Sequence, residues 1–542
     1  MNLRRSWALE TALVAVPAFV FIALAAYHLT LPGLYYDEAA DAIPALDLLQ
    51  GRQPELVRPH GIALFGRTWP LMAFDYVGAV HTYASLAFFS VLGPSVGALR
   101  LMTIAGGALT VALTAVWVRH LFSSRMAGAG AALLLATHPS WVFYARQGVH
   151  VSSLMALWLM GALLLLLAWR RTGSVWWLAG AGLLLGLGLS TKILFLWAIL
   201  ALGFIGLAWQ GPTLWRTWRN PGGAVARLRR ALKPAVAVAV AFVGGAAPLL
   251  IYNLQTGATL DAVAKSAEVT TYGVHNADYP ANLLARLDTL WALLHGGHFW
   301  FLGGLYGNHL FPPAVLVGAA TACALAVRWP PLRGAIALLL GFTFLVVVQS
   351  PVTISGIWPT HLFILLPLLC AIPVVALAAA VRAQSGALRR LGHIAAPLTI
   401  AILAAGNLTV DAQYHEALVR TGGHRGHSDA VYKLASYLDE NGVPAPLAMD
   451  WGIRYTVQLV TAGRVRPLEV FGYTAEPDPG FAARLPLATA EQRYLFHGED
   501  YTAFPRMAAF EQAAAQAGKR TKLEQTFYER SGTPVFMVYS VE

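Results

Sequence analysis

The chain has 542 residues, of which 57% are hydrophobic and only 12% are charged. A water-soluble protein of this length needs far more polar surface, so the composition excludes an ordinary soluble enzyme and indicates a membrane protein with many spanning segments. The formal net charge of +11 would suit a nucleic-acid-binding protein, but the placement of the charges argues against that class.

Eleven apolar runs are long enough, or nearly long enough, to cross a bilayer as helices. They lie at 11–30, 100–118, 126–143, 150–168, 175–190, 192–209, 234–252, 311–327, 334–349, 358–381 and 394–410. The first run is longer than the apolar core of a cleavable signal, so we expect it to be retained. A shorter apolar segment, 81–93, predicts an amphipathic helix lying in the membrane interface.

Basic residues gather in alternate loops between these runs. When the N-terminus is placed in the cytoplasm, the inner segments hold 17 Lys and Arg residues and one nearby acid, Glu10. The outer loops, 31–99 and 254–298, are richer in acids than in bases. This bias predicts a multi-pass protein integral to the plasma or inner membrane. The basic surplus then reflects topology and contact with membrane lipids, with no nucleic acid involved.

The composition changes after residue 410. Helix-like and strand-like stretches alternate with Gly/Pro turns, and the chain ends in PVFMVYSV, which predicts a β-strand. We therefore expect residues 411–542 to form an extracytoplasmic α/β domain. The predicted fold class is a polytopic α-helical membrane protein with about eleven transmembrane helices over 1–410, a further outer loop at 254–310, and this C-terminal soluble domain.

Two adjacent carboxylates, Asp37 and Glu38, follow the first apolar run in the stretch YYDEAADAIPALDLLQG. Acids at this point can cap a helix running through AADAIPALDLL, because carboxylates favour helix N-termini. They can equally serve acid–base chemistry at the membrane surface. Spacing alone leaves both interpretations open.

Four stretches in this order resemble the GT-C glycosyltransferases, in particular the branch of protein O-mannosyltransferases and lipid A aminoarabinose transferases. They are YYDEAADAIPALDLLQG, FFSVLGPSVGALRLMTIAGGALTVAL, THPSWVFYARQGVHVSSL and GLLLGLGLSTKILFL. The resemblance is good over 10–210, is limited to hydropathy over 210–410, and hardly extends to the last domain.

The resemblance implies transfer of a sugar from a polyprenyl-phosphate-linked donor to an acceptor on the extracytoplasmic face, with inversion. It implies Asp37 as the general base, with Glu38 beside it in the catalytic pair. It also implies that Arg100, Arg146 and Lys192, at outer helix ends, bind the donor phosphate. No cofactor or metal is expected, and the acceptor (a protein, lipid or glycan) is left open.

Two departures from the family pattern add further candidates. FDYVGAVHTYASL lacks the basic residue and paired prolines that relatives often carry before the interfacial helix. Arg58, Arg67 or His81 would then supply the missing substrate contact. In RQGVHVSS, His150 is the nearest ionisable group to the position where some relatives have an acid.

A multi-helix transporter or lipid flippase without glycosyl transfer is the alternative function. It predicts ionisable groups near the bilayer midplane and broken helices, whereas the charges here cluster at helix ends. The histidines His295, His298 and His309 lie among glycines that favour a turn over a metal site. The segment GGHRGHSD, with His424 and His427, predicts a solvated linker.

Overall fold

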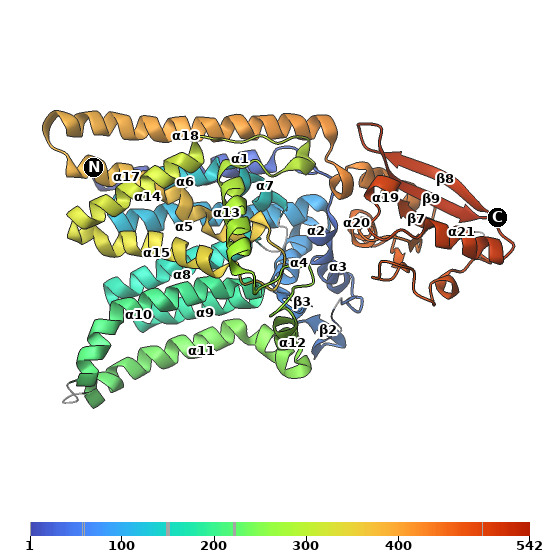
Figure 1. Cartoon of the computed structure of the whole chain (residues 1–542), viewed down its shortest axis with the longest axis horizontal. Coiled ribbons are helices and arrows are strands. Elements are labelled where there is room, and N and C mark those ends of the chain that lie inside the picture. The colour runs from blue at the N-terminus through green and yellow to red at the C-terminus, as the bar shows by residue number, and fades with distance from the viewer. Residues whose placement is uncertain (1, 57, 59, 148–151, 220–223, 490) are drawn as a thin grey trace.

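The computed structural model describes residues 2–56, 58, 60–147, 152–219, 224–489 and 491–542. A bundle of long helices forms one end of the molecule, and a small α/β domain forms the other (Figure 1). The first outer loop, drawn in blue, lies between them. The predicted combination of a helical membrane part and a C-terminal sheet domain is therefore confirmed.

In the described part of the chain, eight helices are long and apolar enough to span a membrane. They comprise all or part of α5 (Val96–Phe122), α8 (Ser152–Thr172), α10 (Leu196–Arg219), α11 (Ala224–Thr256), α14 (Phe311–Arg328), α15 (Arg333–Gln349), α17 (Leu366–Ala383) and α18 (Gly386–Thr421). The spans of α10, α15 and α17 also include the short turns just before these helices. The exact number of spans, about eleven by sequence, stays a prediction because the apolar helical parts of the three remaining runs, such as Glu10–Ala26, are shorter than 18 residues.

The run at 126–143 is divided into two helices. Its two parts are α6 (Arg125–Ala136) and α7 (Pro139–Gln147). The runs at 11–30 and 175–190 each form a single helix, α1 (Asn2–Ala26) and α9 (Val175–Thr191). Pro139 opens α7, where its missing N–H costs no helical hydrogen bond. His138 just before it is buried, with Nε2 3.0 Å from the Leu294 carbonyl oxygen. The break makes α7 a separate short helix that carries Arg146.

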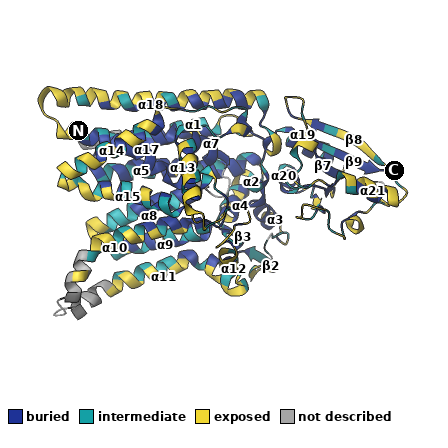
Figure 2. Cartoon of the chain, in the orientation of Figure 1, coloured by how far each residue is buried: buried dark blue, intermediate teal, exposed yellow. Residues whose placement is uncertain are grey.

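The centre of the bundle is largely buried, whereas its rim helices are exposed (Figure 2). Within the span that contains α17, 94% of the residues are buried, compared with 22% in the span of α11. The rim helices α10 and α11 expose bulky apolar side chains, which are Leu200, Phe204, Leu207, Val236, Val240 and Val243. Such a continuous apolar surface suits contact with lipid tails and not with water.

Glycines bring α9 and α11 into backbone contact. A Cβ on Gly186 would overlap the Phe242 carbonyl oxygen, and one on Gly245 would overlap the Leu183 carbonyl oxygen. Small residues at such crossings let membrane helices approach closely. The contact fixes the position of α9, whose end leads directly into Lys192.

The first outer loop contains short helices and two small hairpins. Its elements are α2 (Tyr36–Ala40), α3 (Ile43–Leu49), β1 (Gly61–Leu64), β2 (Arg67–Pro70), β3 (Met72–Phe74), β4 (Val77–Gly78) and α4 (Val80–Leu92). Helix α4 coincides with the predicted helix at 81–93 to within one residue. It buries His81, Thr82 and Ser85 and exposes Val91 and Leu92, as an amphipathic helix does.

The second outer region forms α12 (Ala258–Lys265) and α13 (Tyr279–His295), and α16 (Pro359–Leu362) lies further along the chain. In Figure 1, α13 runs across the direction of the long helices. This orientation places α13 at the end of the bundle that faces the first outer loop.

The C-terminal domain is a five-stranded sheet with helices on both faces. Its elements are α19 (Ala430–Glu440), β5 (Leu447–Ala448), α20 (Arg454–Val460), β6 (Leu468–Glu469), β7 (Tyr494–His497), α21 (Met507–Gln516), β8 (Thr521–Tyr528) and β9 (Pro534–Val541). The strand order is β6-β5-β7-β9-β8, parallel from β6 to β7 and antiparallel from β7 to β8. Strand β9 is the PVFMVYSV segment, as predicted.

Two apolar clusters cover the two faces of this sheet. Leu434 of α19 and Val457 of α20 pack with Leu495 on one face. Phe510 of α21 packs with Tyr494 on the other. The preceding helix, α18, continues to Thr421, so the chain leaves the bundle later than the expected boundary at 410.

Candidate active site

The acidic pair opens α2, and its two members have different surroundings. Asp37 is partly exposed, whereas Glu38 is buried. The Glu38 carboxylate accepts two hydrogen bonds from Arg100 of α5, from Nε to Oε1 at 2.6 Å and from Nη2 to Oε2 at 3.0 Å. Nη1 of Arg100 donates to the carbonyl oxygens of Leu29 and Pro32. Four of the five guanidinium N–H groups are thus used within the protein.

Arg146 of α7 holds the same segment from the other side. Its Nη2 donates to the carbonyl oxygens of His28 and Leu31, both at 2.7 Å. Burial and the neighbouring Arg100 lower the pKa of Arg146 to about 9. Arg100 and Arg146 therefore contact the turn before α2 directly, and these contacts orient the helix that carries Asp37.

The C-terminal domain contacts the loop after α2 as well. The Tyr36 hydroxyl donates to Oε1 of Glu469 at 2.7 Å, and Arg466 forms an ion pair with the buried Asp47 at 2.9 Å. Burial and the Glu469 carboxylate raise the pKa of Tyr36, so its hydroxyl keeps the proton that it donates. Tyr432 donates to the Thr30 carbonyl oxygen at 2.6 Å. Both sides of the acidic pair are thus tied to this domain.

Three tyrosines lie in the surroundings of Asp37. The hydroxyl oxygens of Tyr76 and Tyr272 are 3.4 Å apart. Burial, and then the negative charge of Asp37, raise the pKa of Tyr35, and burial, the Tyr272 hydroxyl and Asp37 raise that of Tyr76. These neutral hydroxyls supply donors and acceptors around a carboxylate that solvent can reach.

Lys192, one of the three predicted phosphate ligands, interacts electrostatically with Asp37. It is 3% exposed and follows α9, and its backbone bridges to Val77 of β4. Burial lowers the pKa of Lys192 to about 8, and the negative charges of Asp41 and Asp37 offset part of that effect. The ammonium group is therefore a buried cation in the electrostatic field of two carboxylates.

Arg286 of α13 is a second buried cation in this region, and the sequence reasoning did not select it. Its Nε donates to the Ser350 carbonyl oxygen at 3.0 Å, and its guanidinium lies 5.4 Å from the centre of the Trp197 ring. Within the described structure, Nη1 and Nη2 are buried and have no hydrogen-bond partner. Its positive charge lowers the pKa of Lys192. Two unsatisfied N–H₂ groups beside a buried ammonium suit an anionic ligand.

His427 is the last of the residues around Asp37. Its ring stacks on Tyr35 at 4.2 Å between centroids and on Phe301 at 4.0 Å. Burial lowers the pKa of His427 to about 3, although Asp37 acts in the opposite direction, so the imidazole is neutral. The expectation of a solvated linker at 422–429 is therefore wrong for His427. We call Asp37, Asp41, Lys192, Arg286 and His427 the Asp37 cluster.

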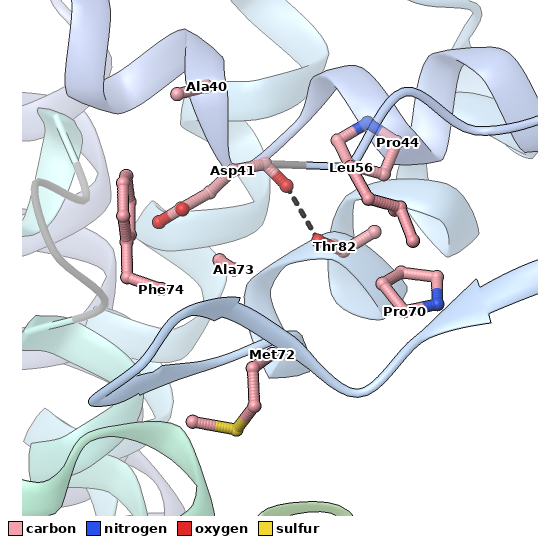
Figure 3. A pocket seen from close by; sticks show the side chains of 9 residues that line it. All are labelled: Ala40, Asp41, Pro44, Leu56, Pro70, Met72, Ala73, Phe74 and Thr82. Carbon is pink, nitrogen blue, oxygen red and sulfur yellow. Dashed lines mark hydrogen bonds between the residues drawn. The ribbon is translucent and has the colours of Figure 1, made fainter. Parts of the chain in front are cut away.

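Asp41 borders a small cavity beneath α2 (Figure 3). The cavity measures about 10 Å³, which is room for about one water molecule. Figure 3 shows the Asp41 carboxylate beside Phe74 and the Thr82 hydroxyl donating to the Asp41 carbonyl oxygen at 2.7 Å. This hydrogen bond attaches α4 to the end of α2.

The remaining predicted contacts are distributed over the first loop. Arg58 forms a bidentate ion pair with Asp75, at 2.7 and 2.8 Å. Arg67 donates to the Leu48 carbonyl oxygen at 3.2 Å, and His81 is buried in the first turn of α4. His150 lies outside the described residues. A substrate contact by any of these four residues stays a prediction.

Residues 78–232 match the family model described as dolichyl-phosphate-mannose-protein mannosyltransferase. The matched segment contains Arg100, Arg146 and Lys192 and begins after the acidic pair. No curated protein matches the chain in sequence.

Three solved structures share the fold. The crystal structure of ArnT from Cupriavidus metallidurans bound to undecaprenyl phosphate has a TM-score of 0.58 at 14% identity, with 98% of each chain covered. That of the Archaeoglobus fulgidus oligosaccharyltransferase in complex with Zn and sulfate has a TM-score of 0.51 at 14% identity, covering 84% of this chain and 62% of that one. The same enzyme tethered to an acceptor peptide containing the NVT sequon has a TM-score of 0.52 at 14% identity, covering 97% and 74%.

These matches agree with the resemblance that the sequence motifs predict. The family model supports it over 78–232, and the fold supports it over nearly the whole chain. By its family match over 78–232 and by its fold, the chain resembles the GT-C membrane glycosyltransferases. To the extent of this resemblance, the prediction of a membrane glycosyltransferase is confirmed.

Proposed function

We propose that this protein transfers a sugar from a polyprenyl-phosphate-linked donor to an acceptor hydroxyl, with inversion, and that Asp37 is the general base. The observation that carries the proposal is the Asp37 cluster, in which the charges of the partly exposed Asp37 and of the buried Arg286 both act on the buried Lys192 at one end of a membrane bundle. The bound undecaprenyl phosphate of ArnT supports a polyprenyl carrier for the donor.

The reaction requires a single displacement at the anomeric carbon. Asp37 accepts the proton of the acceptor hydroxyl as its oxygen forms a bond to that carbon. The bond from the same carbon to the phosphate oxygen breaks, and its electron pair leaves with polyprenyl phosphate. Attack opposite the leaving group inverts the anomeric configuration.

Lys192 and Arg286 are the groups we assign to the donor phosphate. Negative charge grows on the phosphate as it leaves, and fixed cations in a site shielded from water stabilise that charge. Glu38 and Arg100 bond to each other, and Arg100 and Nη2 of Arg146 donate to the turn at 28–32, so we assign these three residues the positioning of Asp37.

The function is tested with the full chain in lipid nanodiscs supplied with a panel of polyprenyl-phosphate sugars. We expect one donor to yield free polyprenyl phosphate and a glycosylated product of inverted configuration, both identified by mass spectrometry and NMR. Movement of the lipid across the membrane with no release of polyprenyl phosphate would favour a flippase and overturn the proposal.

Donor binding is expected to weaken as the pH rises through about 8, because burial lowers the pKa of Lys192 to that value and the ammonium then loses its charge. Below this pH, Lys192 is cationic and the phosphate is held. In Lys192→Arg the guanidinium stays charged, so the alkaline rise in KM for the donor should disappear. If the alkaline rise in KM persists unchanged in this variant, the titration of Lys192 is not its cause.

Arg286→Gln is expected to raise the KM for the donor by at least about tenfold, since a charge-assisted contact to the phosphate contributes about 1.5–3 kcal/mol. Arg333→Gln is the matched control, because among the described residues the Arg333 side chain bonds only to the nearby carbonyl oxygens of Ala326 and Val327, at the other end of the bundle. An equal KM in both variants would remove Arg286 from the phosphate site.

We also propose the orientation predicted from the basic residues, with the Asp37 cluster and the C-terminal domain outside. Cysteine labelling tests it in a Cys323→Ser background, since Cys323 is exposed and Cys370 is buried. Ala517→Cys should react with an impermeant reagent in intact cells, and Ser174→Cys only after permeabilisation. The reverse pattern would invert the topology.

A further inference from the structure

The end of the bundle opposite the Asp37 cluster contains an open cavity of about 300 Å³. It lies at the turn between α5 and α6, beside the last turn of α8. Its lining consists entirely of polar side chains, namely Arg119, His120, Ser123, Ser124, Arg125 and Arg171. The cavity has no part in the reaction proposed above.

Positive charge is in excess around this cavity. Arg119 and Arg125 share one carboxylate, Glu10 of α1, at 2.8 and 2.6 Å. Arg171 donates to neutral groups, the Nδ1 atom and the carbonyl oxygen of His120. A fourth arginine, Arg382 of α17, donates to the carbonyl oxygens of Phe122 and Ser123 and so fixes the turn. Arg119 and Arg125 thus share the charge of Glu10, and Arg171 and Arg382 donate to neutral acceptors.

These arginines differ from cations that merely extend to the membrane surface. Arginines at helix ends often reach lipid headgroups without forming a site. Here they come from four sites in the chain and are held by hydrogen bonds to fixed acceptors, and three of them, Arg119, Arg125 and Arg171, line a concave space. Guanidinium groups so arranged offer paired N–H donors whose geometry matches phosphate oxygens.

We propose that this cavity binds a phosphate group, supplied by the headgroup of an anionic phospholipid or by a soluble phosphate. Arg100 and Arg119 are 19 residues apart on α5, which corresponds to about 28 Å along a helix. That length is close to the hydrocarbon thickness of a bilayer, about 30 Å. The cavity therefore lies at the level of the headgroups opposite to those beside the Asp37 cluster.

The test compares three proteins in nanodiscs or detergent: the wild type, Arg119→Gln/Arg171→Gln, and Arg389→Gln/Arg390→Gln. The last pair lies on α18 at the same end of the bundle and loses the same charge without lining the cavity. Bound lipid is counted by native mass spectrometry with phosphatidylglycerol and phosphatidylcholine. Thermal unfolding is followed with phosphatidylglycerol and with inorganic phosphate.

We expect the wild type and the Arg389→Gln/Arg390→Gln control to retain phosphatidylglycerol over phosphatidylcholine, and the cavity variant to lose at least about tenfold in affinity, since two charge-assisted contacts are removed. If phosphatidylglycerol alone stabilises the wild type more than the cavity variant, the ligand is a lipid headgroup. If inorganic phosphate does so, the ligand is a soluble phosphate. Equal retention and equal stabilisation in all three proteins would overturn the proposal. Should the double variant fail to fold, Arg171→Gln, at an exposed side chain, permits the same comparison.

Discussion

Replacing Asp37 with Asn is expected to reduce sugar transfer by about 10²–10⁴-fold, the usual contribution of a positioned general base. The amide has nearly the shape of the carboxylate but cannot take the proton of the acceptor hydroxyl. Because Asp37 is partly exposed, the substitution should leave folding intact. Turnover is measured in nanodiscs as polyprenyl phosphate released, at saturating donor.

Asp261→Asn is the matched control for this experiment. Asp261 lies on α12, and its exposed side chain is paired only with the likewise exposed Lys265 in the described structure. The control should retain wild-type turnover. Turnover by Asp37→Asn within a factor of about two of the control would remove Asp37 from the base role, since that is far below the usual effect.

Arg100→Met is expected to destabilise the protein by about 3–5 kcal/mol, because it leaves the Glu38 carboxylate buried without its counter-charge. Thermal unfolding in detergent, followed by tryptophan fluorescence, measures the loss. Adding Glu38→Gln in the same chain should recover part of it, since the remaining buried group is then neutral.

The same variant distinguishes the two roles considered for Arg100. If Arg100 positions the loop, Arg100→Met loses stability, and Glu38→Gln restores part of both stability and turnover. If Arg100 binds donor phosphate, as the sequence motifs imply, Arg100→Met should unfold at the wild-type temperature and show a raised KM for the donor. The two readouts therefore test the sequence-based prediction against the observed contacts.

Local patterns in the sequence predicted the elements that local forces determine. The apolar runs indicate where helices span, and β-branched and aromatic residues identify β9. The helix at 81–93 was predicted because its apolar length is too short to cross a bilayer. The break within 126–143 was not predicted, although Thr137, His138 and Pro139 interrupt the apolar run. The partner that holds His138 inside the protein, the Leu294 carbonyl oxygen, comes from a distant helix.

Partners of charged residues could not be predicted in this way. Glu38 and Arg100 are 62 residues apart, and Arg286 and Ser350 are 64 apart. Charge patterning places such residues at helix ends but does not state which ends meet. Arg286 carried a usable signal, as a lone arginine in a helix-forming part of an outer loop with an excess of acids. The position of His427 depends on stacking with Tyr35 and Phe301 from two other parts of the chain.

The hydrogen bond from Tyr36 to Glu469 joins residues 433 positions apart. A ribosome adds about 5–20 residues per second, so roughly 20–90 seconds separate the synthesis of the two partners. During that interval, the N-terminal helices can already be inserted while the acidic loop still lacks the domain that holds it. Under the proposed function and orientation, we expect a nascent chain to stay inactive until its last quarter has crossed the membrane and folded, which would tie the start of activity to the completion of export.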